Sequence, residues 1–332
     1  MDGHKTVMIT GGCGAIGSVV VNRLKKEYPQ TCFVNIDALT YCASESFIEQ
    51  PHDNYRFYYG SINDASFVSY VLRTEKPTLV IHLAAETHVD TSFGNSLKFT
   101  DTNVMGTHTL LECVKNYGGV RHFLHMSTDE VYGSVCDNEA CEEGSLFAPS
   151  NPYSASKAAA EMICHAYLKS FGVPITIMRC NNAISPYQHE EKLVPRCVQT
   201  LLERKEGSTA RIPIHGRGES KRTFIHAADI ASAIDVIAAK GAIGGIYNIG
   251  TFDNMEYSVL DVVRIIIRKM MGADANMDDF IEYVDDRAFQ DYRYCIDSTA
   301  LRTLGWYEKT SFEDAIDDVI KYKTSIWKNN KK

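Results

Sequence analysis

The stretch TVMITGGCGAIG, residues 6–17, decides the fold that we predict for this chain. A short run rich in β-branched residues leads into glycines spaced three residues apart, and an amphipathic stretch follows over residues 18–28. Strand, glycine loop and helix in this order can cradle a phosphate. Gly11 permits the tight turn, Gly14 lets the backbone approach a pyrophosphate, and Gly17 allows the helix to pack closely on the strand. The stretch therefore predicts a dinucleotide site.

A second predicted strand, residues 32–36, ends at Asp37, twenty residues beyond Gly17. An acidic residue at this spacing accepts hydrogen bonds from the adenosine ribose hydroxyls, and it favours NAD over NADP. Apolar runs predict further strands at residues 57–59, 79–83 and 120–126. A long helix is predicted over residues 99–117. Alternating strands and helices imply a parallel sheet with right-handed crossovers.

The last of these strands runs into Thr128, Asp129 and Glu130. Open α/β sheets place their ligands in the loops beyond the carboxyl ends of the strands. Two adjacent carboxyl groups after a hydroxyl suit a site in which one group donates a proton and its neighbour accepts one. The alternative is a solvated turn with a capping hydroxyl, since a motif is a hypothesis until its context is known.

Tyr153 and Lys157 lie one turn apart on a predicted helix that continues to Phe171. A free tyrosine has a pKa of about 10, too high for a base at neutral pH. A lysine ammonium and an oxidised nicotinamide nearby would favour the phenolate. Tyr153 could then take a proton from a sugar hydroxyl while hydride leaves the same carbon.

Together these motifs resemble the extended short-chain dehydrogenase/reductase superfamily. Within it, the Thr128-Asp129-Glu130 run is similar to the nucleotide-sugar 4,6-dehydratases, whereas the epimerases look like Ser-Ser-x-x-Val-Tyr-Gly. The resemblance extends over nearly the whole chain, through residues 83–90, 179–182, 191–195, 213–218, 247–250 and 286–287.

The resemblance implies an α/β fold with a Rossmann-like doubly wound parallel sheet and a smaller mixed α/β substrate-binding domain. We expect residues 1–182 to form the NAD-binding domain, with a return of about 223–250 to it. We expect residues 183–332 to form mainly the substrate domain. Pro213 cannot donate to a ladder, so the strand candidate at residues 211–214 is predicted to lie at an edge.

The resemblance also implies a role for each catalytic residue. Tyr153, with Lys157, would accept the proton of the C4 hydroxyl, and Thr128 would bind the C4 oxygen. Glu130 would remove the C5 proton, and a protonated Asp129 would donate to the departing C6 hydroxyl. Neighbouring carboxyl groups separate each other's pKa values, as such an acid and base require. NAD would stay tightly bound and be recycled, because no net oxidation occurs.

The predicted cofactor contacts are Gly11, Gly14, Ala15, Ile16, Gly17, Asp37, Ala38, Leu39, Thr40, Ser61, Ile62, Leu83, Ala84, Ala85, Thr87, Thr102, Tyr153 and Lys157. The predicted substrate contacts are Thr87, Thr128, Asn182, Glu191, Lys192, Leu193, Pro213, Ile214, Arg222, Asn248 and Arg287. Arginines offer a bidentate fork to a diphosphate. No metal site is predicted.

Residues 87–96, 181–182 and 287–291 look like the UDP-glucose dehydratase domain of plant-type rhamnose synthases. We therefore expect UDP-glucose as the substrate, on a route to rhamnose-type deoxysugars, with dTDP-glucose as the alternative. Ala38 stands where the family commonly has Lys, and Ser61 where it has Asp. On this basis we keep NADP as a second possible cofactor.

The formal net charge of −8 and the lack of a basic stripe exclude nucleic acid as an expected partner. The ten cysteines form no Cys-x-x-Cys pair and lie mostly in apolar runs, as is typical of reduced thiols. No apolar run approaches the roughly 18 residues that span a bilayer, and a strand begins too early for a signal peptide. We expect a cytoplasmic protein that does not contact a membrane.

The long helices that start near Lys98 and Ser154 carry apolar residues on more than one face. The resemblance implies that they pair in a homodimer. Two other functions remain open at this point. A UDP-sugar 4-epimerase or UDP-glucuronate decarboxylase would share Tyr153 and Lys157 without needing Asp129 and Glu130 together. An NAD(H)-sensing binding protein could lack the Tyr-x-x-x-Lys pair, which this chain has.

Overall fold

The computed structural model describes residues 3–50, 53–252 and 255–329. Among them, one seven-stranded sheet has the order β10-β6-β5-β4-β1-β2-β3, and every pairing in it is parallel. Its strands are β1 (Thr6–Thr10), β2 (Cys32–Asp37), β3 (Tyr55–Tyr59), β4 (Leu79–His82), β5 (His122–Thr128), β6 (Ile175–Cys180) and β10 (Ile246–Ile249). The order reverses direction at β1 and β4, which is where doubly wound sheets bind ligands.

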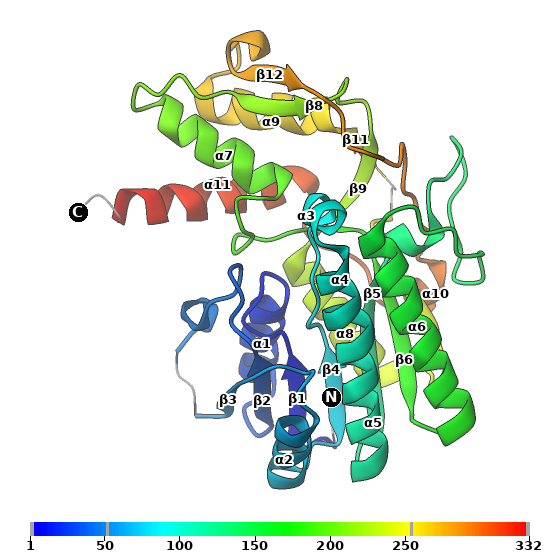
Figure 1. Cartoon of the computed structure of the whole chain (residues 1–332). Helices are drawn as coiled ribbons and strands as arrows, with labels where there is room; N and C mark the ends of the chain where they lie inside the picture. Colours follow the sequence, from blue (N-terminus) through cyan, green and yellow to red (C-terminus); the bar gives the residue numbers. More distant parts are fainter. Residues whose placement is uncertain (1–2, 51–52, 253–254, 330–332) are drawn as a thin grey trace.

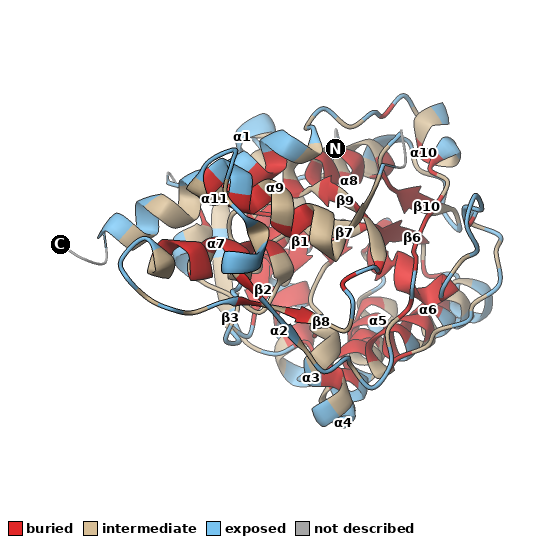
Figure 2. Ribbon diagram, turned by 90° about the horizontal axis from the view of Figure 1, so that it is seen from above, coloured by how far each residue is buried: buried red, intermediate tan, exposed pale blue. Residues whose placement is uncertain are grey.

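Helices cover both faces of this sheet (Figure 1). One face packs on α1 (Gly17–Glu27), α8 (Ala227–Lys240) and α10 (Thr299–Thr303). The other face packs on α2 (Ala65–Glu75), α5 (Thr107–Tyr117) and α6 (Pro152–Phe171). The central strands are buried on both sides, as Figure 2 shows in red. Burial on both faces explains why they read as continuous apolar runs rather than as alternating ones.

The predicted helix at residues 99–117 exists, but the structure divides it. It begins with α4 (Ser96–Phe99), widens into a π-helical segment (Thr100–Gly106) and continues as α5. Within the wide turn, the Asn103 amide donates to the Glu86 carbonyl oxygen and accepts from the Glu86 N–H. The segment thus fixes the loop after β4, and π-bulges of this kind occur frequently at functional sites.

A smaller lobe lies beyond the carboxyl ends of the strands, at the top of Figure 1. Its helices α7 (Leu193–Arg204), α9 (Val259–Met271) and α11 (Phe312–Asn329) share a hydrophobic core with two paired strands. These strands are β8 (Ile212–His215) and β12 (Ile281–Val284), which form a two-stranded parallel sheet. Both are edges, so the edge position predicted for Pro213 is confirmed.

A second small sheet connects the two lobes. It has the order β11-β9-β7, with β7 (Asn182–Ile184), β9 (Lys221–His226) and β11 (Glu256–Ser258). Of residues 223–250, α8 and β10 therefore lie with the main sheet, whereas β9 belongs to this connecting sheet. The division of the chain into two domains stays a prediction.

The short elements are α3 (Val89–Gly94) and the 3₁₀ turns η1 (Glu45–Phe47), η3 (Asp129–Tyr132) and η4 (Met277–Asp279). In the part of the chain that the structure describes, no helix combines the length and apolarity needed to cross a membrane.

Beneath the carboxyl ends of the strands, a buried ion pair joins β6 to α6. Arg179 donates through Nη2 to Glu161 Oε2 over 2.8 Å, and its Nη1 donates to the Tyr132 hydroxyl over 2.6 Å. Both side chains of the ion pair are essentially inaccessible to solvent. The guanidinium also lies over the rings of Tyr132 and Phe147. Charges this deeply buried are tolerated because they pair with each other and the guanidinium also donates to the Tyr132 hydroxyl and the Glu143 carbonyl oxygen.

Candidate active site

Two cavities lie side by side at the carboxyl ends of the main strands. The larger has a volume of about 430 Å³ and is lined by the glycine loop, the loops after β2, β4 and β5, and α6. The smaller, of about 190 Å³, faces the second lobe. Both are lined by Thr87, Glu130, Asn182, Glu191, Lys192, Leu193 and Phe224. This arrangement can place a dinucleotide next to a second ligand.

The glycine loop is built for close backbone approach. A side chain at Gly17 would place its Cβ 2.1 Å from the Gly11 carbonyl oxygen, so only glycine fits there. Gly11 has a positive φ of 73°, and a Cβ on it would lie 2.7 Å from Ala84. Gly11, Gly14, Ala15, Ile16 and Gly17 all line the larger cavity at the amino terminus of α1. A pyrophosphate fits this cradle.

Asp37 ends β2 with its carboxylate held by two backbone N–H groups. Cys13 donates to Oδ2 and Leu39 to Oδ1, each over 2.8 Å. Burial raises the pKa of Asp37, and the two N–H groups lower it. A carboxylate in this position attracts ribose hydroxyls and repels a 2′-phosphate, so the residue fits NAD rather than NADP.

Most of the other predicted cofactor residues also line the larger cavity, namely Ala38, Thr40, Ser61, Ile62, Leu83, Ala84, Ala85, Thr87 and Thr102. The structure does not place Leu39 there. The Leu39 side chain packs against the core beneath α1, and its φ of 47° turns the backbone back towards Asp37.

The five predicted catalytic residues all line the larger cavity. Thr128 ends β5 and accepts from the Glu130 N–H, which starts the 3₁₀ turn carrying the two acids. The side chain of Asn151 caps α6, and Pro152 occupies its first turn, so the helix begins just before Tyr153. One turn later, Lys157 Nζ donates to the Met126 carbonyl oxygen of β5 over 2.6 Å. Strand and helix are thereby tied together at the cavity.

Asp129 is fully buried. Its Oδ2 accepts from the Asn181 amide over 2.8 Å, and its Oδ1 accepts from the Thr128 hydroxyl over 3.2 Å. Burial, followed by the charge of Glu130, raises the pKa of Asp129 to about 7, although Asn181 opposes the shift. At neutral pH a large fraction of Asp129 therefore keeps its proton, as a general acid must.

Glu130 is also buried, in a different environment. Its Oε2 accepts from the Asn151 amide over 3.2 Å and from the Tyr294 hydroxyl over 3.4 Å. Burial raises the pKa of Glu130, while Arg222 and then Asn151 lower it. The net shift is upward, and the Arg222 cation and the Asn151 amide limit it by favouring the carboxylate form that a base requires.

Tyr153 and Lys157 differ from the prediction in one respect. Burial, then the charge of Glu130, raises the pKa of Tyr153, and the Thr128 hydroxyl opposes the shift. Burial lowers the pKa of Lys157 to about 8, and Lys157 is not among the main groups that shift Tyr153. The lysine alone therefore does not favour the phenolate, and that prediction now depends on the positive charge of an oxidised nicotinamide.

The predicted substrate residues fall into four groups, of which Thr128 alone lines only the larger cavity and Thr87 joins those that line both. Asn182, Glu191, Lys192 and Leu193 line both cavities, and Pro213, Arg222 and Arg287 line the smaller one. The structure does not bring Ile214 or Asn248 to either cavity. Side chains alternate along β8, so Pro213 faces the cavity and Ile214 lies in the core. Asn248 is fully buried and donates to the carbonyl oxygens of Cys141 and Asp297.

The sequence prediction missed the residues that hold the two acids. Asn181 binds Asp129, whereas Asn151 and Tyr294 bind Glu130. Tyr294 also donates to Asp291 over 2.5 Å, and the Arg222 guanidinium lies over its ring. Asn151 lies just ahead of the helix that carries Tyr153, and this position could have identified Asn151 as the cap of that helix. Nothing local in the sequence marks Tyr294, because it comes from the distant stretch after β12.

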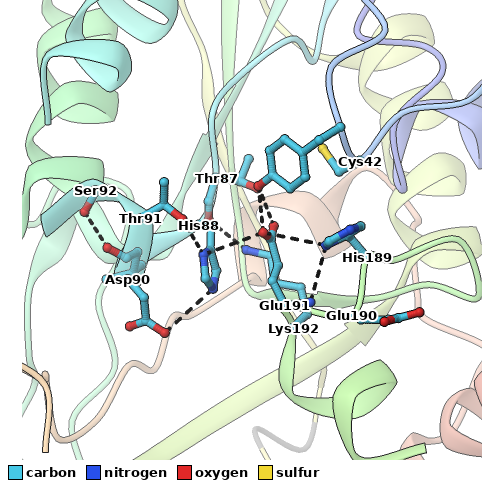
Figure 3. Close-up of polar contacts among 12 residues, drawn as sticks. Cys42, Thr87, His88, Asp90, Thr91, Ser92, His189, Glu190, Glu191 and Lys192 are labelled. Carbon is cyan, nitrogen blue, oxygen red and sulfur yellow. Dashed lines mark hydrogen bonds and ion pairs between the residues drawn. The ribbon is translucent and has the colours of Figure 1, made fainter. Parts of the chain in front are cut away.

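A polar network crosses the mouths of the two cavities, and Figure 3 shows most of it. The Tyr41 hydroxyl lies 2.8 and 2.7 Å from the two carboxylate oxygens of Glu191. His88 lies between Glu191 and Asp90, at 3.6 and 3.7 Å. Lys192 Nζ donates to the Thr87 carbonyl oxygen over 2.8 Å. The network joins the loops after β2 and β4 to the segment before α7.

The family described as GDP-mannose 4,6 dehydratase matches residues 8–319. The chain belongs to the nucleotide-sugar 4,6-dehydratases of the extended short-chain dehydrogenase/reductase superfamily. The resemblance proposed from Thr128, Asp129 and Glu130 is thereby confirmed, and so is the predicted fold class.

One relative in this dehydratase family is the Arabidopsis thaliana trifunctional UDP-glucose 4,6-dehydratase/UDP-4-keto-6-deoxy-D-glucose 3,5-epimerase/UDP-4-keto-L-rhamnose-reductase RHM3. It is 41% identical over 324 residues, which cover 96% of this chain and 47% of that protein. The chain thus spans about half the length of this relative. The dTDP-D-glucose 4,6-dehydratase of Mus musculus is 38% identical over 99% of this chain and 92% of that protein.

Among solved structures, DesIV (dTDP-glucose 4,6-dehydratase) from Streptomyces venezuelae with NAD and TYD bound superposes with a TM-score of 0.89. It is 34% identical, over 96% of this chain and 97% of that one. The dTDP-glucose 4,6-dehydratase from Bacillus anthracis in complex with NAD has a TM-score of 0.86 and 36% identity, over 96% of each chain. Both of these structures hold NAD, and neither supports the NADP alternative.

Proposed function

We propose that this chain is an NAD-dependent UDP-glucose 4,6-dehydratase that makes UDP-4-keto-6-deoxy-glucose. The observation that carries the proposal is the buried pair Asp129 and Glu130 beside Tyr153 in one cavity. The two acids have different partners, and the pKa of Asp129 is raised to about 7. An epimerase that only oxidises and reduces C4 has no need for such a pair.

The first step is oxidation at C4 of the glucose. Bound NAD supplies the group that takes up hydride and later returns it. Thr128 donates a hydrogen bond to the C4 oxygen, and Tyr153 accepts the C4 hydroxyl proton. Lys157 is buried next to β5, and because its pKa falls only to about 8 it is still mostly protonated at pH 7. Its charge then adds to that of the oxidised nicotinamide in favouring the phenolate.

The second step eliminates water across C5 and C6. The new C4 carbonyl makes the C5 proton acidic, and the Glu130 carboxylate takes that proton. Asp129 gives its own proton to the departing C6 hydroxyl, which leaves as water. Hydride then returns to C6, and Glu130 returns a proton to C5. One water is lost and no net oxidation occurs, so one NAD serves successive turnovers. Tyr153 releases the proton it gained and Asp129 takes one up from solvent, which restores both groups.

The choice of UDP-glucose rests on the segments at residues 87–96 and 287–291, which look like those of plant-type rhamnose synthases. The similarity to the Arabidopsis enzyme supports it. The relatives at comparable identity that are dTDP-glucose dehydratases keep dTDP-glucose as the alternative substrate. The proposed end product is a rhamnose-type deoxysugar.

The test is incubation of the NAD-loaded protein with UDP-glucose in deuterated water. We expect a 4-keto-6-deoxy product that carries deuterium at C5. Glu130→Gln should abolish this product and still bind UDP, because Glu130 acts on the sugar. A Glu130→Gln variant with full dehydratase activity would show that another group is the base. A parallel incubation with dTDP-glucose compares the two substrates.

The homodimer is a separate proposal. Large apolar side chains are exposed along α4, the π-helical segment that follows it and α6, including Leu97, Met105, Met162 and Phe171. Pairing of these helices in a second copy of the chain would bury them. Sedimentation at micromolar concentration should therefore give a dimer, and a monomer would contradict the proposal. The cytoplasmic location likewise stays a prediction.

A further inference from the structure

Four cationic side chains line the smaller cavity: Lys192, Arg196, Arg222 and Arg287. Lys192, Arg196 and Arg222 donate to backbone carbonyl oxygens. Among the described residues, Arg287 alone of the four makes an ion pair with a carboxylate, that of Asp90. The pairing requires an explanation, because a carboxylate beside an arginine weakens the attraction of that arginine for an anion.

The geometry of the pair provides one. Arg287 Nε lies 2.6 Å from Asp90 Oδ1, and Nη2 donates to Oδ2 over 3.0 Å. The Nη2 contact is a hydrogen bond, whereas Nε and Oδ1 form a close ion pair without one. A guanidinium has five N–H donors. Nη1 makes no hydrogen bond to a described residue. The N–H groups of Nη1 and the second N–H of Nη2 therefore remain available for a ligand at the wall of the smaller cavity, and we call them the free fork.

The backbone around Asp90 is held by local hydrogen bonds. Asp90 lies in the first turn of α3, which is fixed by the buried Ser92. The Ser92 hydroxyl donates to the Val89 carbonyl oxygen over 2.6 Å, and the Ser92 N–H donates to the His88 carbonyl oxygen over 3.1 Å. Figure 3 shows Asp90 on this turn, with its carboxylate near the His88 ring. These bonds fix the backbone that carries Asp90, whose carboxylate contacts Arg287 and His88.

We propose that Asp90 is a positioning residue that holds Arg287 with its free fork ready for the diphosphate of the nucleotide-sugar. A long arginine side chain loses rotamer freedom when it binds a phosphate. A partner that fixes it beforehand removes that cost, and the gain offsets the weaker charge attraction. The inference rests on the proposed function insofar as the ligand is a nucleotide-sugar; it concerns the diphosphate and not the base.

The test compares ligands with and without the diphosphate. Titration calorimetry of the NAD-loaded protein with UDP and with uridine gives the two affinities. We expect Asp90→Asn to weaken UDP binding about tenfold, from the ordering of one side chain, and to leave uridine binding unchanged. For the reaction, KM for UDP-glucose should rise by a similar factor while kcat stays the same. Equal or tighter UDP binding by Asp90→Asn would overturn the proposal.

Two further variants separate positioning from a general structural effect. Arg287→Ala should weaken UDP binding, and adding Asp90→Asn to it should have no further effect, since the carboxylate acts through the arginine. A full tenfold loss in the Arg287→Ala background would also overturn the proposal. Asp274→Asn removes an exposed carboxylate in the turn after α9 and serves as the charge-matched control, with unchanged UDP affinity.

The same design keeps this inference distinct from the proposed function. UDP and dTDP, each with its nucleoside, are tested by binding without turnover. If the protein fails to convert UDP-glucose but Asp90→Asn weakens the binding of either diphosphate, the positioning role stands and the proposed reaction is wrong. If conversion occurs and the binding of both diphosphates is unchanged in Asp90→Asn, the reaction stands and the positioning role is refuted.

Discussion

The raised pKa of Asp129 is expected to increase the dehydratase activity and to lower the stability of the folded protein. Burial and the charge of Glu130 raise its pKa from 3.8 to about 7. A carboxyl group with the ordinary value would be protonated at pH 7 in roughly one molecule in 1,600, whereas a pKa of about 7 leaves about half protonated. The raised pKa therefore provides several hundred times more of the acid form.

The same shift destabilises the folded state, with a defined pH dependence. The folded-state pKa lies above the unfolded value, so the cost is absent below pH 3.8, grows as pH rises and levels off above pH 7. From the shift, the cost is about 1.7 kcal/mol at pH 5 and about 4 kcal/mol at pH 8. Asp129→Asn removes the charge and keeps the shape. It should stabilise the protein by up to these amounts, less any loss of the hydrogen bond from Asn181.

Urea unfolding of the parent and Asp129→Asn proteins at pH 5 and pH 8 measures this effect. The stabilisation should be larger at pH 8 by about 2.5 kcal/mol, while the dehydration rate falls by a factor of about 10² to 10⁴ because the acid is lost. A free-energy difference that does not change between pH 5 and pH 8 would refute the reasoning, since it would mean that Asp129 titrates normally. Thr128→Ser, which keeps the hydroxyl, serves as a conservative control.

Three other outcomes are expected. The single-turnover dehydration rate should fall about tenfold per pH unit above pH 7, because Asp129 must keep its proton; a rate that still rises at pH 9 would contradict this. Glu161→Gln should lower the free energy of unfolding by about 3–5 kcal/mol by removing the carboxylate partner of buried Arg179, and an unchanged urea midpoint would be inconsistent with that. Gly17→Ala should lose NAD on gel filtration, because its Cβ would collide with the Gly11 carbonyl oxygen; NAD retention at the parent level would disprove the clash.

Five strands of the main sheet, β1 to β5, could be predicted from the sequence because each has a local signal. Glycines at residues 11, 14 and 17 mark the turn into α1, and continuous apolar runs mark buried parallel strands. The π-helical segment at Thr100–Gly106 could not be predicted. It depends on contacts of Asn103 with the distant Glu86 and Ser156, which no helical periodicity records.

The site was predicted where it lies within one motif and missed where it is assembled from several. Asp129, Glu130, Tyr153 and Lys157 follow from their own neighbourhoods in the sequence. Tyr294 and Asn181 reach the acids from other parts of the chain. Ile214 was misplaced because the sequence does not say which face of β8 meets the core. Tyr153 shows a further limit, since its pKa depends on burial among acids that spacing does not reveal.

The place of β10 at the end of the sheet has a consequence for how the chain is made. β6 pairs with β5 on one side, but its other edge stays open until Ile246–Ile249 emerges from the ribosome. That strand begins 66 residues after β6 ends at Cys180, which at 5–20 residues per second is about 3–13 s of synthesis. During this interval the nascent chain presents an unpaired parallel edge that can capture another chain. Chains that terminate before residue 246 are therefore expected to aggregate, even though six of the seven strands are complete.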